Sequence, residues 1–187
     1  GNYTFSVCNN DTVNITGSSD SADFTVYKAV SSIVIAEIVN VTYPESRVIK
    51  KDVSELYKQE FMNSPNESAY CTPYTLLRLL ADKVDEIPDK ILYLDIDIMI
   101  ADDIAKLFNI CIDDYEYAAV KEKYGCWLIR PDYINAGMLL LNMKKIKETG
   151  LLVKARDLIR KKKLLFADQS AIFLSTKKKK LISRIYN

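Results

Sequence analysis

Two aspartates, Asp95 and Asp97, stand two positions apart near the end of the apolar run from Lys90 to Ile100. An extended backbone would project both carboxylates from the same face of a strand. Two like charges side by side in a poorly hydrated setting repel each other, and each resists desolvation. The usual remedies are a shared proton, a basic partner or a metal ion, and no Lys or Arg stands between Lys90 and Lys106. The pattern therefore favours a divalent cation with oxygen ligands, Mn²⁺ or Mg²⁺, completed by substrate phosphates.

The same pair has a purely structural interpretation. Asp95 would then end the strand, and Asp97 would be a solvated turn residue. An Asp-x-Asp pair alone does not decide between the two. The sequence does exclude other chemistry, because it contains no histidine. Ser-His catalysis, Cys-His catalysis and histidine-ligated metal sites are therefore ruled out within these residues.

Length and charge narrow the class of protein further. A chain of 187 residues is predicted to form one domain, residues 1–187, with a substantial core. Its formal net charge of +1 argues against a nucleic-acid partner for the whole chain. The charge is uneven, since residues 144–180 contain 13 Lys and Arg against 3 acids. No apolar run reaches the roughly 20 residues of a membrane-spanning helix.

The lysine-rich C-terminal portion has two interpretations. It is either a solvated face or a surface attracted to anionic lipid headgroups. We expect a cytoplasmic protein, with peripheral contact at the inner face of the membrane as the second possibility for this portion.

Strands alternating with helices predict an α/β fold with a mostly parallel sheet. The apolar run that contains Asp95 is expected to be a buried strand, and ligands in such sheets bind beyond the carboxyl ends of the strands. The other expected elements near the site are a helix over residues 74–81 with Pro73 in its first turn, a loop over 121–131, a strand over 133–142, a long helix over 146–162 and a helix from Asp168 to Leu174. In the long helix, Ile146, Leu151, Val153, Leu158 and Ile159 are expected to form the apolar side.

Three stretches, taken in order, resemble glycosyltransferase family 8, which includes bacterial lipopolysaccharide and lipooligosaccharide galactosyl- and glucosyltransferases. They are Tyr93 to Asp97, Tyr133 to Asn142, and Asp168-Gln169. The resemblance is weaker before Pro73, where Phe5 to Asp11 is similar to the family's first nucleotide-binding strand. It implies a GT-A (Rossmann-like) domain with a central, mostly parallel sheet flanked by helices. It also implies a UDP-sugar donor, Mn²⁺ and retention of the anomeric configuration.

The resemblance assigns expected roles to individual residues. Asp95 and Asp97 would hold the metal against the UDP diphosphate, and Arg78 would contact the donor sugar or the diphosphate. Asp168 would bond sugar hydroxyls, and Gln169 would lie beneath the anomeric carbon. The residues expected along the uridine are Ser6, Cys8 and Asn10, and those expected to line the sugar pocket are Asn135, Ala136 and Gly137.

The chain departs from the family pattern in three places. Cys8 stands where many members have an acid or another polar residue, and Ser170 stands where an acid frequently follows the Asp-Gln pair. The family's C-terminal His-x-x-Gly-x-x-Lys-Pro-Trp segment does not occur in these residues. That segment supplies a histidine metal ligand, so we expect two carboxylates, the diphosphate and water to hold the cation.

The function implied is transfer of a hexose from a UDP-sugar to a hydroxyl of a glycan or glycolipid acceptor. Because Gln169 is a poor nucleophile, retention by attack on the same face of the sugar is favoured over a covalent intermediate. One alternative is a sugar-1-phosphate nucleotidyltransferase, but its glycine-rich loop is missing, since the 5 glycines are not clustered. The other is an inactive, truncated domain that binds a nucleotide sugar or a carbohydrate.

Overall fold

The computed structural model describes residues 2–8, 19–25, 32–36, 48–66 and 73–186, with side chains from residue 51 onward except that of Pro73. The chain divides into two compact units, Gly1–Ser31 and Ser32–Asn187. The first unit contains an antiparallel hairpin of β1 (Asn2–Cys8) and β2 (Ser19–Thr25). The second begins with another antiparallel hairpin, β3 (Ser32–Ala36) and β4 (Val48–Asp52). That the two units act as one catalytic domain stays a prediction.

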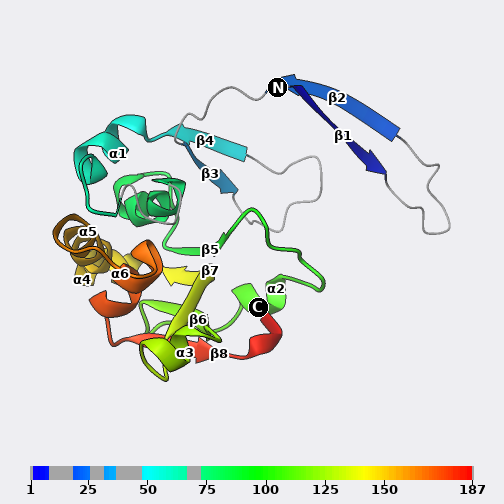
Figure 1. Cartoon of the computed structure of the whole chain (residues 1–187). Helices are drawn as coiled ribbons and strands as arrows, with labels where there is room; N and C mark the ends of the chain where they lie inside the picture. The colour runs from blue at the N-terminus through cyan, green and yellow to red at the C-terminus, as the bar shows by residue number, and fades with distance from the viewer. Residues whose placement is uncertain (1, 9–18, 26–31, 37–47, 67–72, 187) are drawn as a thin grey trace. The chain divides into compact units, whose positions relative to one another are not determined.

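A four-stranded sheet forms the centre of the second unit, in the order β5-β7-β6-β8 (Figure 1). Its strands are β5 (Lys90–Leu94), β6 (Tyr117–Lys121), β7 (Ile134–Asn142) and β8 (Lys179–Ile182). The α/β class is confirmed, but this sheet is mixed and not mostly parallel. Strand β7 runs antiparallel to β5 and to β6, and only β6 and β8 are parallel. The reason is connectivity: β6 returns into β7 at the same sheet edge, where Lys121 pairs with Ile134, without the long crossover that a parallel pair needs.

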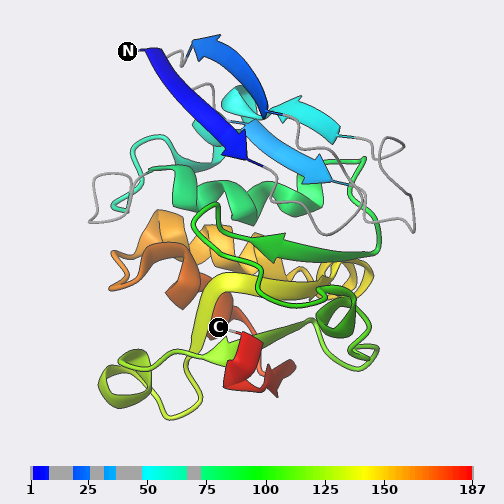
Figure 2. The same cartoon turned by 90° about the vertical axis from the view of Figure 1, so that its right-hand side faces the viewer.

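Different helices cover the two faces of this sheet, so the expected flanking by helices is confirmed (Figures 1 and 2). Because side chains alternate along a strand, Leu139 and Leu141 of β7 face one layer, while Met138 and Leu140 face the other. The first layer is built by α1 (Ser54–Phe61), η1 (Pro73–Lys83), α4 (Met143–Thr149), α5 (Leu151–Lys161) and α6 (Ala167–Ser175). The second layer uses α2 (Ala105–Phe108) and η2 (Arg184–Tyr186).

Two expected elements differ in kind from what forms. The helix expected over residues 74–81 is the 3₁₀ helix η1, which is unusually long for its type at 11 residues. The expected loop over 121–131 contains the short helix α3 (Gly125–Leu128).

The helix expected over residues 146–162 is two helices, separated by Gly150. This glycine has φ of 67°, in the left-handed region that favours glycine and ends helices. The restart changes which side of α5 faces the core. Val153, expected to be buried, is 48% exposed, and Arg156 is buried instead.

The lysine run near the C-terminus is partly built into the fold. Only 8% of the Lys179 side chain is exposed, because its Nζ lies 2.7 Å from an oxygen of Asp132 and 4.6 Å from the ring centre of Phe173. The Nζ of Lys180 donates a hydrogen bond to a backbone carbonyl at 2.9 Å. The predicted contact with an anionic membrane gains no support from this arrangement. Among the described residues, no helix combines the length and the apolar character needed to cross a bilayer.

Candidate functional site

A buried guanidinium stands at the centre of the candidate site. Only 7% of the Arg78 side chain, on η1, is exposed. Its Nη2 donates to Oδ1 of Asp95 at 2.8 Å, and its Nε lies 3.0 Å from Oδ2 of Asp168. Its Nη1 donates to the carbonyl oxygen of Ala136. The planar fork of one arginine therefore ties η1 to the end of β5, the start of β7 and the start of α6.

Asp95 directly follows β5, and the chain turns immediately after it. Its backbone N–H donates to the carbonyl of Gly137 at 2.8 Å, and its carbonyl accepts from the N–H of Ile98 at 3.2 Å. The expectation of an extended backbone through Asp97 is therefore wrong, because pairing with β7 ends here and a turn begins. Asp97 lies in this turn and is exposed. This arrangement matches the structural interpretation, in which Asp95 ends the strand and Asp97 is a solvated turn residue. The structure adds that Asp95 is held by Arg78.

Asp95 also has a second partner that the sequence reasoning did not name. The hydroxyl of Tyr93 donates to its Oδ1 at 2.5 Å, and the Arg78 guanidinium lies 4.5 Å from the centre of the Tyr93 ring. The signal was available, since Tyr93 and Asp95 are two positions apart and a strand places such residues on one face. Burial and the nearby carboxylate Asp95 raise the pKa of Tyr93, although Arg78 opposes this, so the hydroxyl stays a donor.

The start of β7 approaches the same carboxylate closely. A Cβ added to Gly137 would lie 3.3 Å from Oδ2 of Asp95 and 3.1 Å from Oδ1 of Asn135. The Asn135 oxygen also accepts the N–H of Gly137 at 2.8 Å, which fixes the backbone at this point. A glycine is therefore suited to position 137, since backbone, carboxylate and amide share a small space.

Asp168 is a buried carboxylate near the start of α6, with 5% of the residue exposed. The preceding Ala167 has φ of 27°, a conformation that residues other than glycine rarely adopt, and such strain is often concentrated at functional sites. Burial raises the pKa of Asp168 from 3.8 to about 6, although the Arg78 guanidinium lowers it. The carboxylate therefore depends on Arg78 for its charged form.

Gln169 is half-buried between two buried neighbours, Asp168 and Ser170. Its Oε1 accepts the backbone N–H of Ala136 at 2.9 Å, which links α6 to the start of β7. The hydroxyl of Tyr133 lies 2.8 Å from the hydroxyl of Ser170. Burial raises the pKa of Tyr133, although hydrogen bonds to Ser170 and Gln169 lower it. Tyr133 is thus a further site residue that sequence reasoning treated only as part of a strand. The amide of Gln169 is oriented by groups on both sides.

The structure therefore brings together most of the predicted site residues, from four separate segments. These are Arg78, Asp95, Asn135, Ala136, Gly137, Asp168 and Gln169. Ser6 and Cys8 belong to β1, and Asn10 lies outside the described residues. The contact of these three residues with uridine stays a prediction.

The two aspartates after β5 are the candidate cation ligands. Carboxylate oxygens are the ligands that Mn²⁺ and Mg²⁺ prefer. Within the part of the chain that the structure describes, no group of three or more acids and cysteines could hold an ion by itself. No Lys or Arg stands between Lys90 and Lys106, but the fold supplies Asp95 with a basic partner, Arg78, from outside this stretch. Asp95 and Asp97 thus fit a cation only if a bound phosphate and water supply its other ligands.

Comparison with known proteins decides the family. The model of glycosyl transferase family 8 matches residues 14–187, which is most of the chain and includes all the residues that meet around Arg78. The chain belongs to this family. The resemblance inferred from the three sequence stretches is therefore confirmed.

Known glycosyltransferases are similar to parts of this chain. Glycosyltransferase GlyD of Streptococcus pneumoniae is 34% identical over 116 residues, which cover 62% of this chain and 12% of GlyD. A putative glycosyltransferase of Haemophilus influenzae is 30% identical over 108 residues, covering 52% of this chain and 33% of that protein. The chain thus spans less than half the length of these curated relatives.

Solved structures agree with the fold. The glycosyltransferase GlyE of Streptococcus pneumoniae is 28% identical with a TM-score of 0.53, covering 60% of this chain and 28% of GlyE. An active-site mutant of LgtC has a TM-score of 0.52 at 21% identity, covering 66% of this chain and 49% of LgtC, and supports the fold alone. These neighbours have the GT-A fold, so the fold expected for family 8 is confirmed.

The raised pKa of Asp168 gives a testable consequence for stability. We expect Asp168→Asn to stabilise the protein by up to about 3 kcal/mol at about pH 8, since a pKa difference of about two corresponds to that energy. The folded state holds this proton more tightly than the unfolded chain. The stability that Asp168 contributes is therefore complete below about pH 4 and is lost as the pH rises through about 6. Urea unfolding at about pH 4 and pH 8 measures the difference.

The exposed residue Asp85 provides the matched control for this experiment. Asp85→Asn should change stability by less than about 0.5 kcal/mol at both pH values, as is usual for surface positions. If Asp168→Asn destabilised the protein more at pH 8 than at pH 4, the ion pair with Arg78 would outweigh burial and the expectation would be wrong.

Proposed function

We propose that this family 8 chain transfers a hexose from a UDP-sugar to a hydroxyl of a glycan or glycolipid acceptor, with retention of configuration. One observation carries the proposal: Arg78 bridges Asp95 and Asp168 while bonding the backbone at Ala136. Charged side chains, hydrogen-bonding groups and the glycine at the start of β7 thus meet at one edge of the sheet. Nucleotide sugars offer the matching chemistry, an anionic diphosphate next to a hydroxyl-rich ring.

Each residue of the site has a task in this reaction. Asp168 accepts hydrogen bonds from sugar hydroxyls, and Arg78 keeps that carboxylate ionised inside the protein. Gly137 and Asn135 let the sugar ring lie against the backbone of β7. Gln169, with its amide oriented by Ala136 and Tyr133, faces the anomeric carbon. Because these groups are held before the donor binds, little reorganisation is needed during the reaction.

Mn²⁺, or Mg²⁺ in its place, is proposed as the metal. Asp95 and Asp97 would hold it, and when bound it would offset the negative charge that develops on the departing diphosphate. Retention then follows from attack on the same face, because an amide at position 169 is a poor nucleophile. The family match disfavours the nucleotidyltransferase alternative.

The inactive-domain alternative makes a different prediction in a direct assay. A catalytic chain should release UDP slowly from a UDP-hexose in water with Mn²⁺, even without an acceptor. A binding domain should bind the UDP-hexose but should not release UDP from it. UDP-glucose and UDP-galactose are suitable first donors, and no release above the buffer rate from either would favour the inactive domain.

The metal assignment predicts a cation-dependent affinity for UDP. We expect calorimetry to show at least about tenfold tighter UDP binding with Mn²⁺ than without it, because two carboxylates and the diphosphate share the ion. Asp95→Asn with Asp97→Asn should remove the Mn²⁺-dependent part. Asp102→Asn with Asp103→Asn, an exposed acidic pair a few residues later, is the control and should keep it. Equal UDP affinity with and without Mn²⁺ in the unaltered protein would contradict the metal role.

A further inference from the structure

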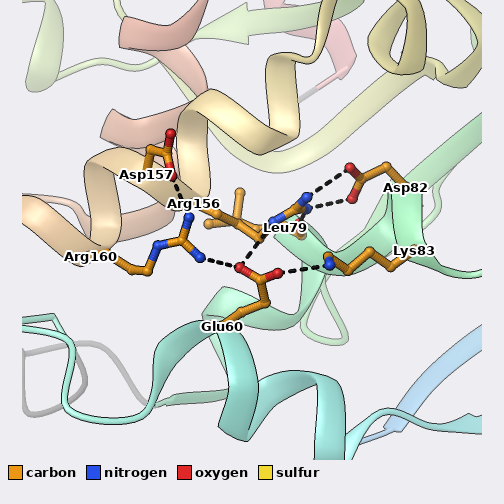
Figure 3. A network of polar contacts seen from close by, with 7 residues as sticks. All are labelled: Glu60, Leu79, Asp82, Lys83, Arg156, Asp157 and Arg160. Carbon is orange, nitrogen blue, oxygen red and sulfur yellow. Dashed lines mark hydrogen bonds and ion pairs between the residues drawn. The ribbon is translucent and has the colours of Figure 1, made fainter.

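A second buried arginine lies in the helical layer behind the site. Arg156, on α5, has a side chain that is 4% exposed. Its guanidinium binds the Asp82 carboxylate through two bonds, Nη1 to Oδ1 at 2.5 Å and Nη2 to Oδ2 at 2.9 Å. Its Nε lies 3.5 Å from an oxygen of Glu60 on α1 (Figure 3). A guanidinium buried this deeply and bonded bidentately is held in one geometry.

Two of the contacts of Arg156 fall on η1, the helix that carries Arg78. Besides Asp82, its Nη1 donates to the backbone carbonyl of Leu79 at 2.5 Å (Figure 3). A 3₁₀ helix advances by about 120° per residue, so residues three apart are eclipsed and Leu79 and Asp82 lie on one side. Arg78 lies on the adjacent side, one residue earlier. A bond to the Leu79–Asp82 side therefore fixes the rotation of η1 and with it the direction of Arg78.

The bonds from Arg156 are important because η1 is a 3₁₀ helix. Runs of 3₁₀ geometry longer than 3–4 residues are uncommon because their hydrogen bonds are poorly aligned. An α-helical arrangement of the same residues turns by only about 100° per residue, which would change the direction of Arg78 relative to Asp82. A side chain that holds both a carbonyl and a carboxylate of η1 favours the observed geometry over that alternative.

We propose that Arg156 is a positioning residue, which aims Arg78 at Asp95 and Asp168 by fixing the rotation of η1. Its value for catalysis rests on the proposed function, but its effect on Arg78 does not. Arg156 lies in the helical layer and bonds no residue of the site itself among those the structure describes.

The same network offers a matched control on the same helix. Arg160 lies one turn after Arg156, and its described ion pairs are with Glu60 and Asp157, not with η1 (Figure 3). Arg160→Gln therefore perturbs the network without releasing η1. Arg156→Lys is the principal variant, because an ammonium keeps the positive charge but cannot bond Leu79 and both oxygens of Asp82 together. Asp82→Asn is a second variant that removes the carboxylate and leaves Arg156 in place.

The first measurement follows Arg78 directly and needs no donor. The Nε–H of Arg78, held by Asp168, should give a signal in proton–nitrogen correlation NMR, identified by its loss in Arg78→Lys. We expect Arg156→Lys and Asp82→Asn to shift this signal and to speed its exchange with water, while Arg160→Gln leaves it unchanged. An unshifted, slowly exchanging signal in a folded Arg156→Lys variant would overturn the inference, whatever the function of the protein.

The second measurement uses UDP release from the UDP-hexose. Arg156→Lys should lower kcat/KM by about tenfold to a hundredfold, as expected when a site group is displaced by a fraction of an ångström to one ångström. In the Arg78→Lys background it should lower kcat/KM no further, since the two residues act as a unit. If the double variant instead lost kcat/KM by the product of the two single losses, Arg156 would act independently of Arg78 and the inference would be overturned. An unaltered protein without UDP release would instead contradict the proposed function, and the NMR result would still decide the role of Arg156.

Discussion

Arg78→Met is expected to destabilise the protein by about 3–5 kcal/mol at about pH 8, the cost of leaving a buried charge without its partner. The reason lies in its contacts, since Arg78 lies beside two carboxylates, Asp95 and Asp168, and the second is almost fully buried. The loss should be smaller at about pH 5. Without Arg78, the pKa of Asp168 would rise above its present value of about 6, so the carboxyl would be protonated at pH 5 and no longer be an unpaired charge. Urea unfolding at both pH values measures the two losses.

Two controls make this result specific. Arg78→Lys keeps the charge but not the fork, so its loss of stability should be intermediate. Arg130→Met removes an arginine whose side chain is 53% exposed, and its ion pair with Asp132 should be worth no more than about 1 kcal/mol. An Arg78→Met protein as stable as the unaltered one at pH 8 would show that the buried carboxylates do not depend on Arg78.

Gln169→Ala is expected to lower kcat about tenfold to a thousandfold, the range for removing one preorganised electrostatic contact. The prediction rests on the proposed placement of Gln169 beneath the anomeric carbon, where a contact made in the transition state affects kcat more than donor binding. The affinity for UDP should barely change, because the side chain faces the sugar and not the nucleotide. UDP-hexose kinetics and UDP calorimetry together separate the two effects.

A serine near the end of the same helix provides the control for this substitution. Ser175→Ala removes a hydroxyl that donates to the carbonyl of Ala171 within α6, so kcat should fall by less than about threefold. Since Gln169 also accepts the N–H of Ala136, thermal unfolding must confirm that Gln169→Ala stays folded. Loss of UDP binding with unchanged turnover of bound donor would make Gln169 a structural residue and would contradict its placement.

Local patterns in the sequence determined much about this protein. Runs rich in Ile and Leu marked the strands at Lys90–Leu94 and Ile134–Asn142, because strand residues here face covered layers on both sides. The three stretches at positions 93–97, 133–142 and 168–169, taken in order, indicated the family, and with it the set of residues that meet in the site. These features depend on residues that are close together along the chain, so they can be recognised in the sequence itself.

Tertiary structure decided what depends on distant partners. The basic partner of Asp95 lies outside the stretch around it, because Arg78 comes from the helix η1, 17 positions earlier. The burial of Arg156 followed from the restart of the helix after Gly150, whose left-handed conformation changed the phase of every later residue. The direction of the strands followed from where each connection ends, and so the expected parallel sheet became a mixed one. Charge pairing, helix phase and strand direction are set by contacts across the fold, so the order of residues alone left them open.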